Sequence, residues 1–572
     1  MSVPKNYRES SDDGVLTGLV LGPLIAAALL AAALTHRVLP PGWAIEPPPR
    51  LPRGPPARDA LVLARYALVG FATLSSAILL LHVCAARWLE GPASPEGERR
   101  SVPRSEGRRS FYFVLFTLGV SAAAAVLRVG LARCGAGLWQ HLSLFDVIVA
   151  SLFYQFTLYV AIRMAHRGFT LGELALVCFG GTAVFMEFLN ITIARIWPIT
   201  TPYIKTFRLP TPLVILQTAL IAGPFLTGFL LAPFLVLSRH AAQMPARRRR
   251  HPADALRARR LLALACAVGA ALTILGPLGI WTRWCLRADP WLWAVRTVLA
   301  RRRRLALLAY WGALGGVSVG GWTRQLARTR RYRAVTEAAA ADGAASGGEQ
   351  TPAGALFAAP GELLDRADKQ LPMLGLNARR KFFHALVVVM FVPGVAFDPA
   401  FTHLAFSVAF ALFVFAEYVR YFAIYPVGAA VHLFMNEFLD QKDRGTAILS
   451  HFYLLTGCAG ALWLEGPTRL VQFTGVLVLG IGDALASIVG KRHGRHRWSP
   501  TTQKTLEGSA AFTVSVVASA WALRLCGLAD PFSTVRYIGV VAVASVLEAL
   551  SDQNDNLTLP LYTWSALVLA GV

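Results

Sequence analysis

Residues 480–508 combine a carboxylate, several cations and four glycines at the edge of one apolar run. Asp483 lies inside the run, and five cations follow within about two dozen residues: Lys491, Arg492, Arg495, Arg497 and Lys504. Glycine lets a backbone approach phosphate oxygens, Lys and Arg neutralise them, and a carboxylate holds the Mg²⁺ that accompanies a nucleotide. The stretch therefore predicts a nucleotide-phosphate site at a membrane surface. A basic loop that anchors a helix end on anionic lipid fits the charges equally well.

Two further clusters carry a cation next to a group that needs a partner. Arg380 and Lys381 precede His384 by up to one helical turn, at the start of an apolar run. An interfacial anchor explains the cations, whereas an imidazole in hydrocarbon is costly unless it is hydrogen-bonded. His384 is thus open between a structural role and a site role. Glu417 and Arg420 share one helix face, where they either pair with each other or belong to the site.

Carboxylates also crowd two turns. Asp443 lies in a charged turn between two apolar runs, a setting in which charges are normally only solvated. Glu548, Asp552 and Asp555 lie within eight residues and precede Asn556, and we expect the first two, four residues apart, to face the same way on a helix. Like charges this close repel unless a cation lies among them. The second group predicts a metal or proton-transfer site, with a solvated helix end as the alternative.

The elements that position these residues must be membrane helices. The chain has 572 residues, of which 55% are hydrophobic and only 15% charged, and its mean hydropathy is +0.50. Continuous apolar runs long enough to cross a bilayer recur throughout, without the strict alternation of a β-barrel. We predict an all-α, polytopic transmembrane helical bundle with roughly 13 to 16 spans.

Charge and cysteine usage exclude other classes of protein. The net charge of +24 comes from arginine clusters between apolar runs, as in cytoplasmic loops that face anionic lipid. Because no nucleic-acid-binding motif accompanies the charge, we expect the lipid bilayer as a partner and no nucleic acid. The seven cysteines are scattered without a CxxC pair, which argues against a zinc site and a disulfide framework.

Composition divides the chain into three parts. We expect an N-terminal multi-span membrane region at 1–322, a polar flexible linker at 323–376 and a C-terminal catalytic membrane domain at 377–572. The positive-inside rule places the N-terminus in the cytoplasm. If every apolar run crossed, however, residues 491–504 would lie on the opposite side. At least one run therefore does not span; the region 282–322 is open, and 422–438, which polar residues interrupt, is the main suspect.

Taken together, the polar pieces resemble the signature of the CTP-dependent polyprenol kinases. Phytol kinase and CTP-dependent diacylglycerol kinase share this signature, and phosphatidate cytidylyltransferase has a related one. The order and spacing are most similar to the dolichol kinases. The residues that carry the resemblance are Gly482-Asp483, Ser487, Gly490 to Gly494, Lys504 to Gly508, Arg380 to His384, Glu417, Arg420, Asp443 with Gly445, Glu548, and Asp555 to Pro560.

The resemblance implies a CTP-dependent lipid kinase of the endoplasmic reticulum membrane whose CTP site faces the cytosol. It would transfer the γ-phosphate of CTP to the terminal hydroxyl of dolichol, giving CDP and the dolichyl phosphate used in protein glycosylation. The residues expected to contact CTP are Gly482, Ser487, Gly490, Lys491, Arg492, His493, Gly494, Lys504, Thr505, Glu507 and Gly508.

Roles within that site follow from the chemistry of phosphoryl transfer, which needs positioning and charge neutralisation. We expect the turn at 490–494 to offer backbone N–H groups to phosphate oxygens. Asp483 is the first expected ligand of Mg²⁺, with Asp555 or Glu507 second. The base beside the lipid hydroxyl is Asp443, Asp552 or His384. No GxxxxGK[ST] loop is present, so the choice of CTP over ATP rests on the resemblance.

Other functions stay open at this stage. A kinase of phytol or diacylglycerol would use the same site, and a lipid cytidylyltransferase would release pyrophosphate instead of CDP. A membrane transporter predicts internal repeats between the two halves, and none is visible. A structural scaffold would leave the clustered polar residues unexplained.

Overall fold

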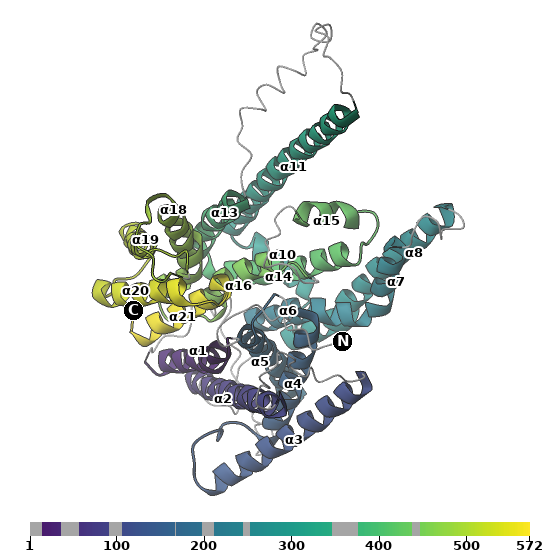
Figure 1. The fold of residues 1–572 in the computed structure, drawn as a ribbon. Helices are drawn as coiled ribbons and strands as arrows, with labels where there is room; N and C mark the ends of the chain where they lie inside the picture. Colours follow the sequence, from purple (N-terminus) through teal and green to yellow (C-terminus); the bar gives the residue numbers. More distant parts are fainter. Residues whose placement is uncertain are drawn as a thin grey trace.

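The computed structural model describes residues 14–35, 57–90, 106–165, 168–196, 211–243, 252–345, 376–436, 447–500 and 502–572 (Figure 1). Every regular element in these ranges is a helix, apart from one isolated β-bridge between Arg497 and Thr505. The all-α fold class is therefore confirmed. In the same ranges, eleven helices are long and apolar enough to cross a membrane.

The N-terminal region begins with five long helices at the lower part of Figure 1. α1 packs against both α2 and α5, while α4 packs against α3 and α5. Small residues allow the contact between α1 and α5, since a Cβ on Gly172 of α5 would collide with the carbonyl of Gly14, directly before α1. The helices are α1 (Val15–Thr35), α2 (Ala57–Glu90), α3 (Glu106–Arg133), α4 (Leu144–Ala165) and α5 (Leu171–Ile196).

The middle of the chain contributes helices of very different lengths, from α9 with 8 residues to α11 with 44. A π-helical segment with Pro277 inside it breaks the run between α8 and α9. Asp289 caps α10, whose ten residues are too few to cross a bilayer. The elements are α6 (Pro212–Leu230), α7 (Ala232–Gln243), α8 (Pro252–Thr273), η3 (Ile274–Leu278), α9 (Gly279–Leu286), α10 (Pro290–Leu299) and α11 (Arg302–Ala345).

The C-terminal region holds shorter helices around a central π-helical segment, η6. This segment contacts α13 on one side and α19 on the other. The elements are α13 (Leu376–Phe397), α14 (Pro399–Tyr421), α15 (Gly428–Asn436), α16 (Ser450–Trp463), α17 (Arg469–Gln472), η6 (Val476–Asp483), α18 (Ala484–His493), α19 (Leu506–Leu525), α20 (Thr534–Leu550) and α21 (Asp555–Leu569).

One hydrophobic cluster joins the two regions. It contains buried residues of α1, such as Leu21, together with Phe512 of α19 and Trp564 of α21. α1 also packs directly against α21, and the two lie next to each other in Figure 1. The division at 322 and 376 stays a prediction, and the regions on either side of it share a core.

Eleven candidate spans are fewer than the 13 to 16 crossings predicted from the sequence. Four further stretches of the C-terminal region are shorter or more polar: α16, η6 continued by α18, α20 and α21. The count of 13 to 16 crossings stays a prediction. α15 has only nine residues, about 14 Å of helix, and cannot cross a hydrocarbon core of about 30 Å. The suspicion that 422–438 does not span is therefore supported.

The polar residues lie at two opposite ends of the bundle. Lys381, near the start of α13, contacts Asp483, whereas Asp398, just after the end of α13, contacts Arg304 at 2.8 Å. Because α13 separates these contacts, Arg301 to Arg304 lie at the end away from Asp483. If α15 does not cross, residues 491–504 can lie on the same side as the N-terminus, with Arg301 to Arg304 on the opposite side.

Candidate active site

Asp483 lies at the last position of η6, with its side chain buried between helices. Two glycines make this placement possible: a Cβ on Gly480 would collide with Val388 of α13, and one on Gly482 would lie 2.8 Å from Phe512 and from Val516 of α19. α13 and α19 therefore approach η6 from both sides. Gly482, expected to contact CTP, is buried in this helix contact and supports the position of Asp483.

Lys381 and His384 hold the Asp483 carboxylate from the side of α13. The Lys381 Nζ lies 2.6 Å from Asp483 Oδ2 and donates to the Asp483 carbonyl at 3.1 Å. The His384 Nδ1–H donates to the Leu479 carbonyl at 2.7 Å and lies 3.3 Å from Asp483 Oδ2. The buried imidazole thus has the partner that its cost in hydrocarbon demands. Both residues orient Asp483, and Arg380 is half-buried beside them.

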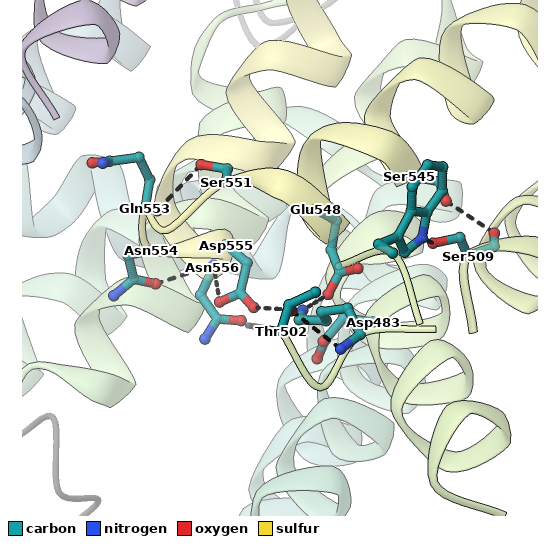
Figure 2. A network of polar contacts seen from close by, with 12 residues as sticks. Asp483, Thr502, Ser509, Ser545, Glu548, Ser551, Gln553, Asn554, Asp555 and Asn556 are labelled. Atoms are coloured by element: carbon teal, nitrogen blue, oxygen red, sulfur yellow. Dashed lines mark hydrogen bonds and ion pairs between the residues drawn. The ribbon is translucent and has the colours of Figure 1, made fainter. Parts of the chain in front are cut away.

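Three carboxylates meet in front of α20 and α21. One oxygen each of Asp483, Glu548 and Asp555 lies within 4.8 Å of the others, and Figure 2 shows the three side chains pointing toward one another. We name these three residues the carboxylate cluster. The Lys504 ammonium forms an ion pair with Glu548 and lies 3.9 Å from Asp555 Oδ2. Lys504 therefore supplies a positive charge that reduces the repulsion among the three carboxylates.

The segment between α18 and α19 folds back on itself and so brings Lys504 to the carboxylate cluster. The Trp498 N–H donates to the Lys504 carbonyl at 3.2 Å, beside the bridge between Arg497 and Thr505. The Trp498 indole N–H donates to Ser509 Oγ at 2.9 Å, which fastens this segment to α19. Thr505 caps α19 by accepting the Gly508 N–H. The described residues of this segment, 494–500 and 502–505, thus form a hairpin that carries Lys504.

The prediction that residues 490–494 form a turn is wrong. Gly490 to His493 are the last turn of α18, and the Gly494 N–H donates to the Gly490 carbonyl at 3.1 Å. Lys491 and Arg492 favour this helical end, because cations stabilise the C-terminus of a helix dipole. Gly490 faces Thr505 and Gly508 instead, where a Cβ would lie 3.1 Å from Thr505 Oγ1. The exposed side chains are Lys491, Arg492 and His493, and Ser487 is half-buried.

The turn between α20 and α21 sets the position of Asp555. Asn554 caps α21 and accepts the Asn556 N–H at 3.1 Å. Asn556 is buried, and its Oδ1 has no hydrogen-bond partner among the described residues. The expectation that Asp552 shares a helix face with Glu548 is wrong, since α20 ends at Leu550 and Asp552 is exposed.

Glu417 and Arg420 pair with each other and fix the start of α16. The Arg420 Nε–H donates to Glu417 Oε2 at 2.8 Å, and the Ile448 N–H donates to Glu417 Oε1 at 3.1 Å. Both side chains are buried. They hold the end of the segment that contains Asp443, which itself lies outside the described residues.

Glu507, one of the expected metal ligands, has another partner. It lies 2.7 Å from His496 Nδ1 and accepts the His496 N–H. The carboxylate cluster therefore includes Asp483 and Asp555 of the expected ligands, and Glu548 in place of Glu507.

Sequence reasoning missed Glu173. It caps its own helix, accepting the Thr170 N–H at 3.0 Å, and it also accepts the Asn554 N–H at 2.5 Å. Its signal is a capping box, Thr170 followed three residues later by Glu173. That pattern predicts the start of α5, but it does not predict the second contact.

The donor set fits a divalent metal ion. Mg²⁺ takes oxygen ligands, usually from one or two carboxylates with water and substrate phosphate. The carboxylate cluster offers three carboxylates, and the unpartnered Asn556 Oδ1 lies next to Asp555 in the chain. The residues present can therefore hold a metal ion and a phosphate group together at the end of the bundle.

Comparison with known proteins agrees with this arrangement. Residues 375–532 match the family model for dolichol kinase. In this region, the chain is therefore similar to the dolichol kinases. The family match includes Lys381, Asp483 and Lys504, and it ends before Glu548 and Asp555.

Individual relatives extend the similarity. Dolichol kinase of Mus musculus is 31% identical over 317 residues, 52% of this chain and 51% of the mouse protein. Dolichol kinase sec59 of Schizosaccharomyces pombe is 42% identical over 195 residues, 33% of this chain and 38% of the yeast protein. Dolichol kinase EVAN of Arabidopsis thaliana is 31% identical over 415 residues, 70% of this chain and 64% of the plant protein. The matches thus span about half of the mouse protein and less of the fission-yeast one. No solved structure matches the chain.

Proposed function

We propose that the chain is a dolichol kinase, which transfers the γ-phosphate of CTP to the terminal hydroxyl of dolichol. The products are CDP and the dolichyl phosphate that protein glycosylation consumes. The observation that carries the proposal is the carboxylate cluster with Lys381 and Lys504 on its two sides. The names of the relatives supply the acceptor.

Asp483, Glu548 and Asp555 are the proposed ligands of Mg²⁺. When bound, the ion neutralises the charge of the CTP phosphates. Lys504 is 40% exposed, more than its partner Glu548 at 5%, so its ammonium can turn toward a phosphate oxygen while the carboxylates are occupied. Lys491 and Arg492, exposed at the end of α18, are positioned by the same hairpin and extend the positive surface.

Of the three residues expected as the base beside the lipid hydroxyl, one has an orienting role. His384 donates from Nδ1 to the Leu479 carbonyl, lies 3.3 Å from Asp483 Oδ2 and is almost fully buried, so we assign it to orientation. Asp552 is exposed at the α20–α21 turn, and Asp443 lies outside the described residues.

We place the site on the cytosolic face of the endoplasmic reticulum membrane. Gly14, at the start of α1, lies against Thr170 and Gln553, and Gln553 comes two residues before Asp555. The N-terminus of α1 is therefore at the same end as the site. Arginine-rich sequences at 97–109 and 246–260 follow α2 and α7 in the chain. When successive spans alternate in direction, α2 and α7 end on the same side of the membrane as the N-terminus of α1. The positive-inside rule makes that side cytosolic.

A product assay with purified protein tests the proposal. CTP or ATP labelled at the γ-phosphate is supplied with dolichol, phytol or diacylglycerol, and the lipid products are separated. We expect label in dolichyl phosphate, with CTP as donor and CDP as by-product. Labelled pyrophosphate together with an unlabelled lipid ester of CMP would identify transfer of the cytidylyl group instead.

The site assignment is tested by Asp483→Asn in the same assay. The substitution keeps the size of the side chain and removes the charge that Lys381 and the metal ion require. We expect a loss of about 100-fold or more in turnover, as for removal of one group that stabilises transition-state charge. Asp530→Asn, on the exposed α19–α20 connection, is the control. Near-normal turnover in Asp483→Asn would refute the assignment.

A further inference from the structure

The start of α5, in the N-terminal region, reaches the turn that carries Asp555. Three contacts join the segment 168–173 to the C-terminal region. The Tyr453 hydroxyl donates to the Gly168 carbonyl at 2.7 Å, the Thr170 hydroxyl donates to Gln553 Oε1 at 2.7 Å, and Glu173 accepts the Asn554 N–H. Residues far apart in the sequence thus meet one position away from a proposed metal ligand.

Glu173 uses its two oxygens for two different parts of the chain. Oε2 accepts the Thr170 N–H of its own helix start, and Oε1 accepts the Asn554 N–H. The side chain is fully buried. Burial of a carboxylate is costly unless hydrogen bonds compensate it, so both oxygens are held tightly in place. Fixing the Asn554 backbone fixes the cap of α21, and therefore the direction in which Asp555 points.

A cap alone does not need this arrangement, as α4 demonstrates. Asp146 caps α4 with the same spacing: it accepts the Ser143 N–H at 2.9 Å, and its own N–H donates to Ser143 Oγ at 3.0 Å. It is also buried. A single oxygen, Oδ2, accepts both Ser143 N–H and Ser143 O–H. α4 packs against α2, α3 and α5. Asp146 is thus a matched cap within the N-terminal region.

We propose that Glu173 is a positioning residue for the proposed metal site, acting through Asn554 on Asp555 and Asn556. The N-terminal region would then complete the active site of the C-terminal region, beyond burying its helices. The inference rests on the proposed function for its catalytic consequence, and on the geometry alone for its consequence in metal binding.

The experiment uses the full-length protein and the variants Glu173→Ala, Glu173→Gln and Asp146→Ala. Mn²⁺ serves as the probe, and its binding is followed by electron paramagnetic resonance without substrate. Turnover of CTP and dolichol is measured in parallel, and the unfolding temperature of each variant is recorded. We expect Glu173→Ala to weaken Mn²⁺ binding about 10- to 100-fold, as loss of a group that orients a ligand does.

The other variants separate positioning from folding. Glu173→Gln keeps one carbonyl oxygen and is expected to restore part of the Mn²⁺ affinity. Asp146→Ala removes the cap of α4 and is therefore expected to lower the unfolding temperature. Its Mn²⁺ affinity is expected to stay within about twofold of that of the wild type. If Glu173→Ala does not accumulate, the Mn²⁺ affinity of Glu173→Gln is compared with that of the wild type. A lower affinity in the variant then supports the inference, and an equal affinity overturns it.

Two results would overturn the inference: equal Mn²⁺ affinities for the Glu173 and Asp146 variants, or a wild type that binds no Mn²⁺. Failure of the proposed function looks different. In that case the wild type binds Mn²⁺, and Glu173→Ala weakens the binding, but no dolichyl phosphate forms from CTP.

Discussion

Asp483 shows how much one buried charge depends on its partners. Its carboxylate is 13% exposed, and the Lys381 ammonium beside it is 15% exposed. Removal of one member of a buried ion pair leaves the other without compensation, which typically costs about 3 to 5 kcal/mol. Removal of both members costs much less. The pair is therefore a measurable element of stability in addition to its role in the site.

We predict that Lys381→Met destabilises the protein more than the double variant Lys381→Met with Asp483→Asn. The expected difference is about 3 kcal/mol in the free energy of unfolding, measured by denaturation in detergent. Both variants are expected to be inactive, so stability alone distinguishes them. A double variant that is less stable than Lys381→Met would contradict a direct ion pair.

The sequence was informative about single residues and less so about how they meet. The cost of a charge in hydrocarbon singled out Asp483 and His384, and both lie at the site. The grouping of Glu548 with Asp483 depends on the packing of α20 against α19, which no local pattern contains. Asp552 was misplaced because α20 ends two residues before it, and helix ends depend on caps that are difficult to locate from sequence.

At the scale of elements, glycines decide how closely the helices approach. α16 packs against α21 where Gly457 faces the backbone of Asn556, so a Cβ at that position would collide with the Asn556 carbonyl. Since α21 begins at Asp555, any shift of its first turn moves a proposed metal ligand. The glycines at 480, 482, 490 and 508 act in the same way around η6, α18 and α19, rather than as a flexible phosphate-binding loop.

We predict that Gly457→Ala lowers turnover at least tenfold and also lowers the unfolding temperature, because the added methyl group displaces the start of α21. Gly539→Ala is the control: Gly539 lies in α20, and no atom is within 4 Å of a Cβ there. Because alanine favours a helix by roughly 1 kcal/mol over glycine, this variant should be as stable as the wild type or more so. Equal effects at the two positions would disprove the steric explanation.

At the scale of the whole molecule, the two halves depend on each other. The family match covers only residues 375–532, yet the buried cluster around α21 includes α1 and α5. Hydropathy predicted the membrane class and the approximate number of helices, because an apolar run of about twenty residues has few stable structures other than a membrane helix. It did not predict that α1, at the opposite end of the sequence, packs against α21.

We predict that residues 377–572 expressed alone do not form a stable, active protein, since α21 would lose its packing against α1 and the turn before α21 would lose its hydrogen bonds to Thr170 and Glu173. Expression with residues 1–345 as a separate chain should restore part of the activity. The measurements are the yield of monodisperse protein and the production of dolichyl phosphate. A stable and active 377–572 fragment would refute the dependence.

The lengths of α16, α20 and α21 have a consequence for the bilayer itself. These helices have 14, 17 and 15 residues, about 21 to 26 Å of rise, compared with a hydrocarbon thickness of about 30 Å. Hydrophobic mismatch of this size is relieved by local thinning of the membrane. We therefore expect the lipid surface to dip toward the carboxylate cluster, so that the hydroxyl of the proposed lipid substrate would reach the cluster without leaving its leaflet.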